Sequence, residues 1–292
     1  MRRALGFKLV SQGPRLMSFV AFCEDRRADR VTADLAVEWA TATKGDEVNQ
    51  ARRLDVVRIF ARHLRALDPG TEVPPDDILS RRYRRIPPYL YSPEEVSALM
   101  SAAGRLRPAI RAAAWQALIG LLAVTGMRPG EACRLGCGDV DLETGTIVIE
   151  ESKFGKSRLV FLDPTAVTGL RAYEKARDEA FPEATAFLVN SCGRPLRGTY
   201  LPHVFGPLAE AAGIQAPPGQ RAPRLHDLRH VFAVATLLDW YRDGGDVQAR
   251  LPVLSTWLGH VDPKSTYWYL QAVPELLALA AGRLGPAGEE AR

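Results

Sequence analysis

Apolar side chains in the first quarter of the chain recur at the three- and four-residue spacing of amphipathic helices. Two such runs lie between Gly13 and Leu67. Their apolar positions are Leu16, Phe19, Val20 and Cys23 in the first run and Leu54, Val57, Phe60, Ala61 and Leu64 in the second. Because each run places its apolar residues on one face, the pattern predicts a small helical domain over residues 1–67.

This pattern stops at residues 68–88, which contain five prolines and one glycine. Proline and glycine in this density are typical of a linker. The same stretch holds R-R-Y-R-R at residues 81–85, four arginines around a tyrosine. Such a cluster is either a plain solvated run or a segment suited to lie along a nucleic-acid backbone.

A second domain is predicted over residues 89–292, and it opens with clear signals for the start of a helix. Ser92 can cap, Pro93 fits the first helical position and Glu95 completes a capping box. The uncharged stretch Ala112–Met127 has 16 residues. It is shorter than the roughly 20 residues that a membrane-spanning helix needs, so it predicts a buried core helix.

The rest of this domain reads as mostly helical with a few short strands. Residues 147–149 and 159–161 predict a hairpin around the turn F-G-K-S, and residues 187–189 predict a further short strand. Later helices are predicted at H-D-L-R-H, after Gly244-Gly245 and from Pro274 onward. The predicted fold class is therefore mainly α with a small β-sheet, in two domains.

Composition excludes several classes of protein and adds one hint about partners. No apolar run follows the basic start M-R-R-A-L-G-F-K, so we expect a cytoplasmic protein without signal peptide or anchor. Four cysteines form no dense framework, which favours buried thiols. Residues 1–88 hold 17 Lys and Arg against 12 Asp and Glu, whereas the remainder holds 21 against 22. A basic N-terminal part suggests a polyanion as partner.

The string H-D-L-R-H carries the first candidate chemistry. On a helix, His226 and Arg229 share one face, and an imidazole beside a guanidinium can grip a phosphodiester. His226 and His230 also have the spacing of zinc ligands. The zinc-protease form requires Glu after the first histidine, but Asp227 stands there, so a zinc hydrolase is the weaker alternative.

Three further strings hold candidate residues that have ordinary explanations when each is taken alone. Arg128 in T-G-M-R-P-G-E lies where a helix begins, which favours an anion. The hairpin carries Lys153 and Lys156, either of which can donate a proton if neighbouring cations lower its pKa. After L-G-H come Tyr267 and Tyr269, which are nucleophiles only if cationic groups stabilise the phenolate.

Together these strings resemble the tyrosine recombinase (phage integrase) family, from about Tyr89 to the end. That family's pattern is T-G-x-R-x-x-E, a hairpin lysine, H-x-x-R, L-G-H and a tyrosine nine residues after that histidine. The matching positions here are Arg128 with Glu131, Lys153, His226 with Arg229, Leu258-Gly259-His260 and Tyr269. Tyr267 falls at the seventh place and does not match. The C-terminal tail looks most like that of transposon-encoded members.

The resemblance implies a role for each matched residue. Tyr269 would attack the phosphodiester and form a 3′-phosphotyrosyl link. Arg128 and Arg229 would clamp the non-bridging oxygens, with His226 and His260 as proton-transfer and hydrogen-bonding partners. Lys153 would protonate the leaving 5′-oxygen, with Lys156 as its rival on the same turn. No metal or ATP would be needed, because the bond energy is kept in the phosphotyrosine.

The resemblance also implies double-stranded DNA as the partner and a homo-tetramer assembled on it. The two domains would form a C-shaped clamp around a duplex, and the protein would be nucleoid-associated when bound. Candidate DNA-binding side chains are Arg52, Arg53, Arg58, Arg62, Arg81, Arg82, Arg84 and Arg85. A type IB topoisomerase, which nicks and reseals one duplex, is the alternative activity. A non-catalytic DNA-binding regulator is disfavoured because all six site positions are filled.

Overall fold

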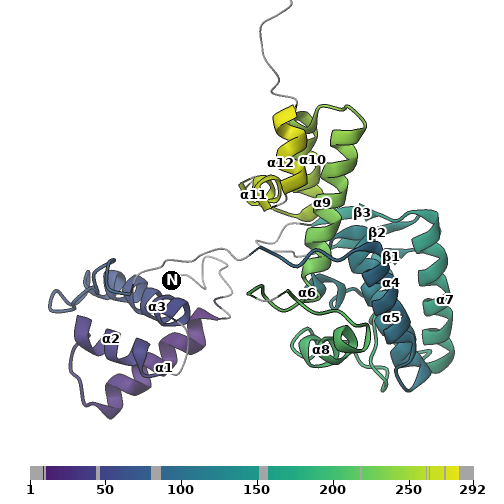
Figure 1. Ribbon diagram of the computed structural model, residues 1–292. Coiled ribbons are helices and arrows are strands. Elements are labelled where there is room, and N and C mark those ends of the chain that lie inside the picture. The colour runs from purple at the N-terminus through teal and green to yellow at the C-terminus, as the bar shows by residue number, and fades with distance from the viewer. Residues whose placement is uncertain are drawn as a thin grey trace, which may run out of the picture. The chain divides into compact units, whose positions relative to one another are not determined.

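The computed structural model describes residues 9, 11–43, 47–79, 87–150, 157–217, 219–260, 262, 264–272 and 274–282. The chain divides into two compact units, Met1–Arg85 and Ile86–Arg292 (Figure 1). The described residues form mostly helices with one three-stranded sheet, which confirms the predicted fold class. In this part of the chain, no helix combines the length and the apolar character needed to cross a membrane.

Within its described residues, the first unit has three helices, α1 (Gln12–Asp25), α2 (Ala33–Thr41) and α3 (Glu47–Leu64). The predicted apolar runs coincide with α1 and α3. The sequence reading missed α2, which the Thr32 side chain caps by accepting from the Leu35 amide. Trp39 of α2 packs edge-on against Phe19, with 5.3 Å between ring centroids, so α2 completes the core of this unit.

Arg58 corrects the set of predicted DNA-binding arginines. Its side chain is only 4% exposed and forms an ion pair with Asp55 at 2.6 Å. Its Nε and Nη2 donate to the carbonyls of Pro74 and Pro75 at 2.9 and 2.6 Å. The guanidinium therefore holds the first part of the predicted linker against α3, and this buried group is not available to a polyanion.

The second unit begins with the helix start that the sequence predicted. Ser92 accepts from the Glu95 amide at 3.2 Å, and Glu95 accepts from the Ser92 amide at 2.9 Å, which confirms the capping box. The helices of this unit are α4 (Pro93–Gly104), α5 (Ala109–Thr125), α6 (Pro129–Ala132), α7 (Pro164–Ala180), α8 (Leu201–Ala211), α9 (Asp227–Arg242), α10 (Val247–Leu258), α11 (Lys264–Ala272) and α12 (Pro274–Gly282). The α5 helix is buried on most of its surface, so the uncharged stretch is a core helix as predicted.

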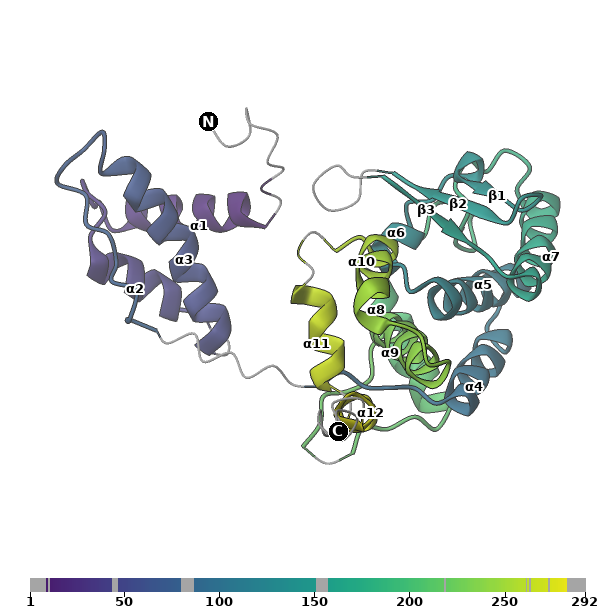
Figure 2. The same ribbon diagram turned by 90° about the horizontal axis from the view of Figure 1, so that it is seen from above.

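One antiparallel sheet flanks these helices, with the strand order β1–β2–β3 (Figure 2). Its strands are β1 (Val140–Asp141), β2 (Thr146–Ile149) and β3 (Arg158–Phe161). Ile147 pairs with Val160 in the predicted hairpin, and both side chains are buried. Of the predicted turn F-G-K-S, residues 154–156 lie outside the described residues.

The predicted strand at residues 187–189 is wrong. Its side chains are buried, but Val189 forms only an isolated bridge with Pro195. The hydroxyl of Tyr173 donates to the Phe187 carbonyl and accepts from the Val189 amide, each at 3.0 Å. The Phe187 amide donates to the Leu135 carbonyl and the Leu188 carbonyl accepts from the Leu196 amide, so the Tyr173 hydroxyl and single main-chain bonds satisfy this segment without a strand ladder.

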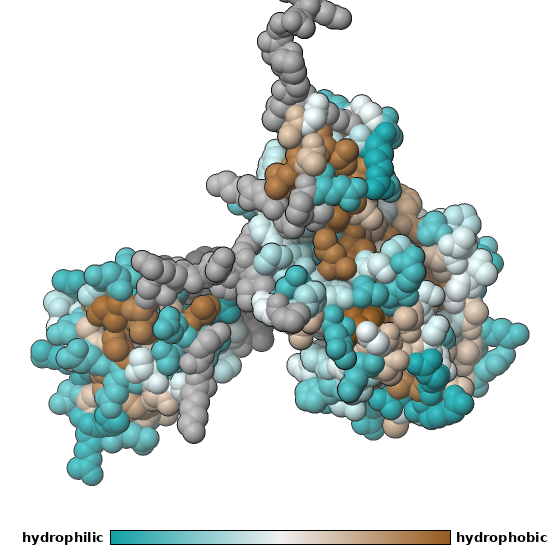
Figure 3. Space-filling model, viewed as in Figure 1, coloured by the Kyte–Doolittle hydropathy of each residue, from teal (hydrophilic) through white to brown (hydrophobic). Residues whose placement is uncertain are grey.

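A separate small core joins α9, α10, α11 and α12. Leu276 of α12 is buried in it together with Tyr269 of α11. The helix predicted from Pro274 onward is α12, and it contacts α9 and α11 of the same chain. Figure 3 shows apolar surface over α11 and α12, where Tyr267 and Leu277 are exposed.

Gly126 ends α5 in the left-handed conformation, with φ of 62°. A Cβ atom at this position would lie 2.5 Å from the Phe232 ring and 3.1 Å from the Leu258 side chain. We expect Gly126→Ala to lower the free energy of unfolding by about 2–4 kcal/mol, because strain and overpacking add. Urea unfolding followed by circular dichroism would measure this change.

The control is Gly169→Ala in α7, where an added Cβ meets nothing within 4 Å among the described residues. This exposed helical site should gain stability, by about 0.5–1 kcal/mol. Equal effects of the two substitutions would contradict the role given to Gly126.

Candidate active site

Three arginines from distant parts of the chain converge on the C-terminal end of α10. They donate to three successive backbone carbonyls, those of residues 257, 258 and 259. Arg158 Nε reaches Trp257 O at 2.7 Å, Arg229 Nη2 reaches Leu258 O at 2.5 Å, and Arg128 Nη2 reaches Gly259 O at 3.0 Å. Carbonyls at a helix C-terminus lack intrahelical partners and carry the negative end of the helix dipole, so they suit cations.

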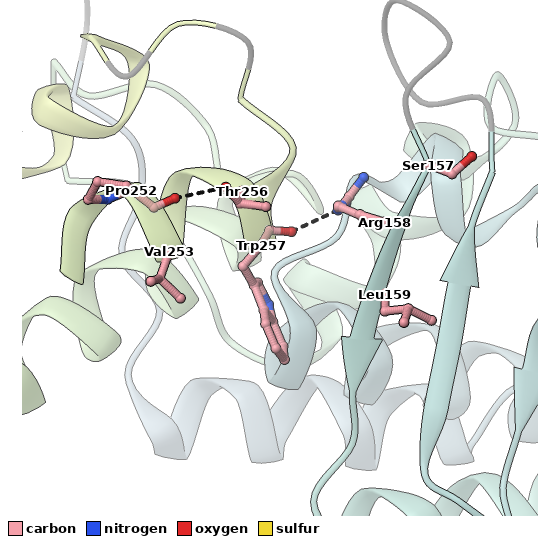
Figure 4. Close-up of a pocket in the computed structure, with 7 residues that line it drawn as sticks. All are labelled: Ser157, Arg158, Leu159, Pro252, Val253, Thr256 and Trp257. Atoms are coloured by element: carbon pink, nitrogen blue, oxygen red, sulfur yellow. Dashed lines mark hydrogen bonds between the residues drawn. The ribbon is translucent and has the colours of Figure 1, made fainter. Parts of the chain in front are cut away.

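Gly259 makes this arrangement possible in the L-G-H string. It ends α10 with φ of 65°, and a Cβ there would lie 2.8 Å from Nη1 of Arg158. The close approach of Arg158 from β3 to the main chain of Trp257 is visible in Figure 4. The glycine therefore allows both the turn toward His260 and the access of a guanidinium.

Glu131 is the buried counter-ion of this cluster. It accepts from Arg128 Nη1 at 2.6 Å and from Arg158 Nη2 at 2.7 Å, and it also accepts from the Arg128 amide at 2.9 Å. Burial by itself raises the pKa of Glu131, but the hydrogen bonds and charges of the two arginines outweigh it and lower the pKa to about 2. The carboxylate thus stays ionised and fixes both guanidinium groups.

Arg229 is buried on the first turn of α9. Besides Leu258 O, its Nη1 donates to the carbonyl of Gly126 at 2.8 Å. Burial and the neighbouring charge of Arg128 lower the pKa of Arg229 to about 10, so the group remains a cation at neutral pH. The two arginines therefore present adjacent positive charges from α6 and α9, which is an arrangement suited to an anion.

Three histidines surround these arginines, and all three are neutral at pH 7. Burial is the largest cause of the shift at each ring, followed by nearby cationic groups such as Arg229. The pKa falls to about 4 for His226 and to about 3 for both His230 and His260. A neutral imidazole can accept a proton or donate a hydrogen bond, so each ring keeps both abilities.

Tyr269 lies among these rings, on the side of α11 that packs into the small core. Its ring stacks on His260 with centroids 6.1 Å apart and meets His230 at 5.4 Å. Nδ1 of His260 is in turn hydrogen-bonded to the Thr266 hydroxyl at 2.8 Å. Tyr269 is 2% exposed whereas Tyr267 is 46% exposed, so the two tyrosines lie in different environments.

The structure thus brings together five of the six predicted catalytic residues: Arg128, His226, Arg229, His260 and Tyr269. Lys153 and its rival Lys156 lie outside the described residues, as do Arg81, Arg82, Arg84 and Arg85. On α3, Arg52 and Arg62 are exposed, while Arg53 stacks over the Trp39 ring at 3.9 Å.

Sequence reasoning missed Arg158, which ties β3 to both Glu131 and α10. Arg158 stands directly after the predicted turn F-G-K-S, but a strand arginine is usually solvated. Glu131 in the string T-G-M-R-P-G-E offered a signal. A buried carboxylate needs cationic partners, so a second arginine beside Arg128 was to be expected.

The zinc alternative lacks a ligand set in the described part of the chain. The rings of His226 and His230 lie 5.4 Å apart, between centroids. No group of three or more His, Cys, Asp or Glu side chains is placed to hold a metal among the described residues. Nδ1 of His230 is buried there without a described hydrogen-bond partner.

Comparison with known proteins agrees with the geometry. The model of the phage integrase family matches residues 90–275. The Sinorhizobium fredii protein y4rB, which carries an integrase/recombinase name, is 40% identical over 97% of this chain and 93% of its own length. The tyrosine recombinase XerC of Lactobacillus delbrueckii is 28% identical over 79% of this chain and 74% of its own.

Solved structures share the fold at lower identity. The Tn1549 transposon integrase in complex with transposon right end DNA has a TM-score of 0.65 and is 17% identical, covering 98% of both chains. A lambda integrase tetramer bound to a Holliday junction has a TM-score of 0.63 at 15% identity, covering 91% of this chain and 74% of that one.

The histidines predict how stability depends on pH. Their folded pKa values lie below the value of about 6.5 for an unfolded histidine, so protons bind preferentially to the unfolded chain. The contribution of the neutral histidines to the free energy of unfolding is therefore fully present above pH 6.5, and it is lost as the pH decreases toward 4. Each histidine contributes a slope of up to about 1.4 kcal/mol per pH unit, measurable by urea unfolding between pH 7 and 5.

His230→Phe is the matched variant, because it keeps an aromatic ring beside Trp268 and Tyr269 and removes one titrating group. Over the same pH range, the slope of its unfolding free energy against pH should be smaller by up to about 1.4 kcal/mol per pH unit, which is the contribution of one proton. A slope identical to that of the unchanged protein would count against a neutral His230.

Proposed function

Because this chain belongs to the phage integrase family and is a tyrosine recombinase, we propose that it cuts and rejoins DNA at specific sites through a 3′-phosphotyrosyl link on Tyr269. The observation that carries the proposal is the pair of fixed cations, Arg128 and Arg229, held on successive carbonyls beside the ring pair His260–Tyr269. Such preorganised donors stabilise the charge that builds on a phosphate during transfer, and removal of one costs about 3–4 kcal/mol.

In the proposed step, the phenolic oxygen of Tyr269 forms a bond to phosphorus while the bond from phosphorus to the 5′-oxygen breaks. Arg128 and Arg229 hold the non-bridging oxygens. His226, neutral at pH 7, takes the phenolic proton, and Lys153 gives a proton to the 5′-oxygen. His260 donates a hydrogen bond to the phosphate, and the reverse reaction with another 5′-hydroxyl completes strand exchange.

The burial of Tyr269 adds a requirement to this mechanism. Because its side chain is 2% exposed, its oxygen reaches a DNA phosphate only after α11 has shifted from the core that it shares with α9 and α10. The proposed reaction uses no metal and no ATP, since the phosphotyrosine retains the energy of the phosphodiester.

We propose double-stranded DNA as the partner of both units. Exposed arginines of α3, such as Arg52 and Arg62, would contact phosphates, and two duplexes would be held by four copies of the chain. The solved lambda integrase assembly, a tetramer on a Holliday junction, supports this stoichiometry by its shared fold.

The nucleophile can be tested with a library of nicked suicide duplexes that have randomised core sequences. The unchanged protein should form a covalent DNA adduct that resists detergent, with EDTA present and ATP absent. Tyr269→Phe should form none, because phenylalanine has no oxygen to attack phosphorus. Electrophoresis of the denatured products measures the adduct, and sequencing of the captured DNA defines the site.

Tyr267→Phe is the control, two residues away and exposed, and its adduct should match that of the unchanged protein. An adduct that persists in Tyr269→Phe would refute the assignment. Relaxation of a supercoiled plasmid that lacks the captured site would instead indicate topoisomerase activity.

Assembly can be tested on the exposed side of α12. Leu277 is exposed while its neighbour Leu276 is buried in the chain's own core. Leu277→Glu should leave the urea midpoint unchanged and reduce the fraction of four-copy complexes on the captured DNA at least tenfold, as measured by mass photometry. Leu276→Ser, the comparison variant, should lower stability itself by about 2–4 kcal/mol. Intact tetramers of Leu277→Glu would exclude docking through this face.

A further inference from the structure

A second cationic cluster lies directly before the His226–Arg229 pair. Asp227, on the first turn of α9, is 0% exposed. Its Oδ1 accepts from Arg221 Nη2 at 3.0 Å and from Arg224 Nη2 at 3.2 Å, and its Oδ2 accepts from the Arg224 amide at 2.9 Å. One buried carboxylate therefore fixes two guanidinium groups and the main chain between them.

The main chain of this segment is also held from the other side. The hydroxyl of Tyr91 donates to the Arg224 carbonyl at 3.0 Å, and Tyr91 itself is buried in the large core. The arginines are thus anchored at both backbone and side chain, which lowers the conformational entropy that binding a ligand would cost.

Both guanidinium groups remain partly open to solvent. The Arg224 side chain is 47% exposed and the Arg221 side chain 28%. Each guanidinium has five N–H donors and directs one Nη2 to Asp227, so donors remain for an anion on the outer side. Nε of Arg221 is buried without a partner among the described residues. Two positive charges against one carboxylate leave a net positive site.

The cluster also lies within electrostatic reach of the proposed scissile phosphate. Burial lowers the pKa of the His226 ring most, and the charges of Arg229, Arg224, Arg128 and Arg221 lower it further. Arg224 precedes His226 by only two residues. The pair therefore acts on the same ring as Arg128 and Arg229.

We infer that Arg221 and Arg224, clamped by Asp227, form a second phosphate-binding site, which takes a DNA backbone phosphate adjacent to the one held by Arg128 and Arg229. This inference rests on the proposed function for its ligand. Contacts with phosphate oxygens carry no sequence information but fix the register of the duplex. The second site thereby places the scissile bond before Tyr269 approaches.

The test is the salt dependence of binding to a random-sequence duplex, measured by fluorescence anisotropy from 50 to 200 mM NaCl. Each phosphate contact adds about 0.9 to the slope of log K against log salt. Because the two arginines hold one phosphate, Arg221→Gln and Arg224→Gln should each lower the slope, and the double variant should lower it by about 0.9. Across this range, the affinity of the double variant should fall about 3.5-fold less than that of the unchanged protein.

Two controls separate phosphate binding from a structural role. Lys175→Gln removes one exposed charge from α7 and should leave the slope unchanged. Arg224→Lys keeps the charge but loses the planar fork. Its slope of log K against log salt should equal that of the unchanged protein, even if urea unfolding shows reduced stability. A glutamine double variant with the unchanged protein's slope would overturn the inference.

The outcome is separable from that of the suicide-duplex experiment. A reduced slope without any covalent adduct would leave the phosphate site standing and remove the proposed chemistry. An adduct together with an unchanged slope would remove this site alone.

Discussion

The catalytic unit depends on one electrostatic constraint, the meeting of three guanidinium groups with the C-terminal carbonyls of α10. The three are Arg128 directly before α6, Arg158 of β3 and Arg229 of α9. Each donates to one of three successive carbonyls. The helix terminus supplies partial negative charge without a protonatable group, so it orders cations without neutralising them. Arg128 keeps 26% of its side chain exposed, whereas Arg158 and Arg229 are held in place below the surface.

Glu131 supplies negative charge among the three arginines. Neighbouring guanidinium groups repel one another, and burial disfavours the charged form of each. A carboxylate buried between Arg128 and Arg158 offsets the repulsion and is held ionised by the same two groups, with a pKa of about 2. Asp227 forms ion pairs with Arg221 and Arg224, which precede α9. Each of the two buried acidic residues therefore holds a pair of arginines through ion pairs.

Burial, together with the same cations, keeps the histidines neutral. Because His226 and His260 are neutral beside Arg229, they are able to exchange protons or donate hydrogen bonds without adding to the repulsion. Tyr269 is enclosed by these rings on α11, which belongs to the small core of α9–α12. The α10 helix whose carbonyls hold the cations belongs to the same small core as Tyr269.

Local signals in the sequence were sufficient for much of the helical framework. The capping box at Ser92, the α5 stretch and the hairpin of β2 and β3 were all predicted, because each depends on neighbouring residues. The short strand at residues 187–189 was predicted wrongly, because a short apolar run has the same sequence pattern whether or not it pairs with another strand. The helix α2 was not identified, although it lies within the stretch that was predicted to be helical. The sequence likewise did not distinguish Arg58 from the exposed arginines of α3, because its burial results from contacts with the distant carbonyls of Pro74 and Pro75.

The sequence by itself determined the candidate catalytic set, because motif spacing along the chain selects Tyr269 over Tyr267 and pairs His226 with Arg229. Only the tertiary structure decided that Arg158 contacts Glu131 and α10 beside that set, that Asp227 pairs with two further arginines and that Tyr269 is buried. The physical reason is that charge balance and burial depend on groups far apart in the chain, such as Arg128 and Gly259, which no local pattern brings together.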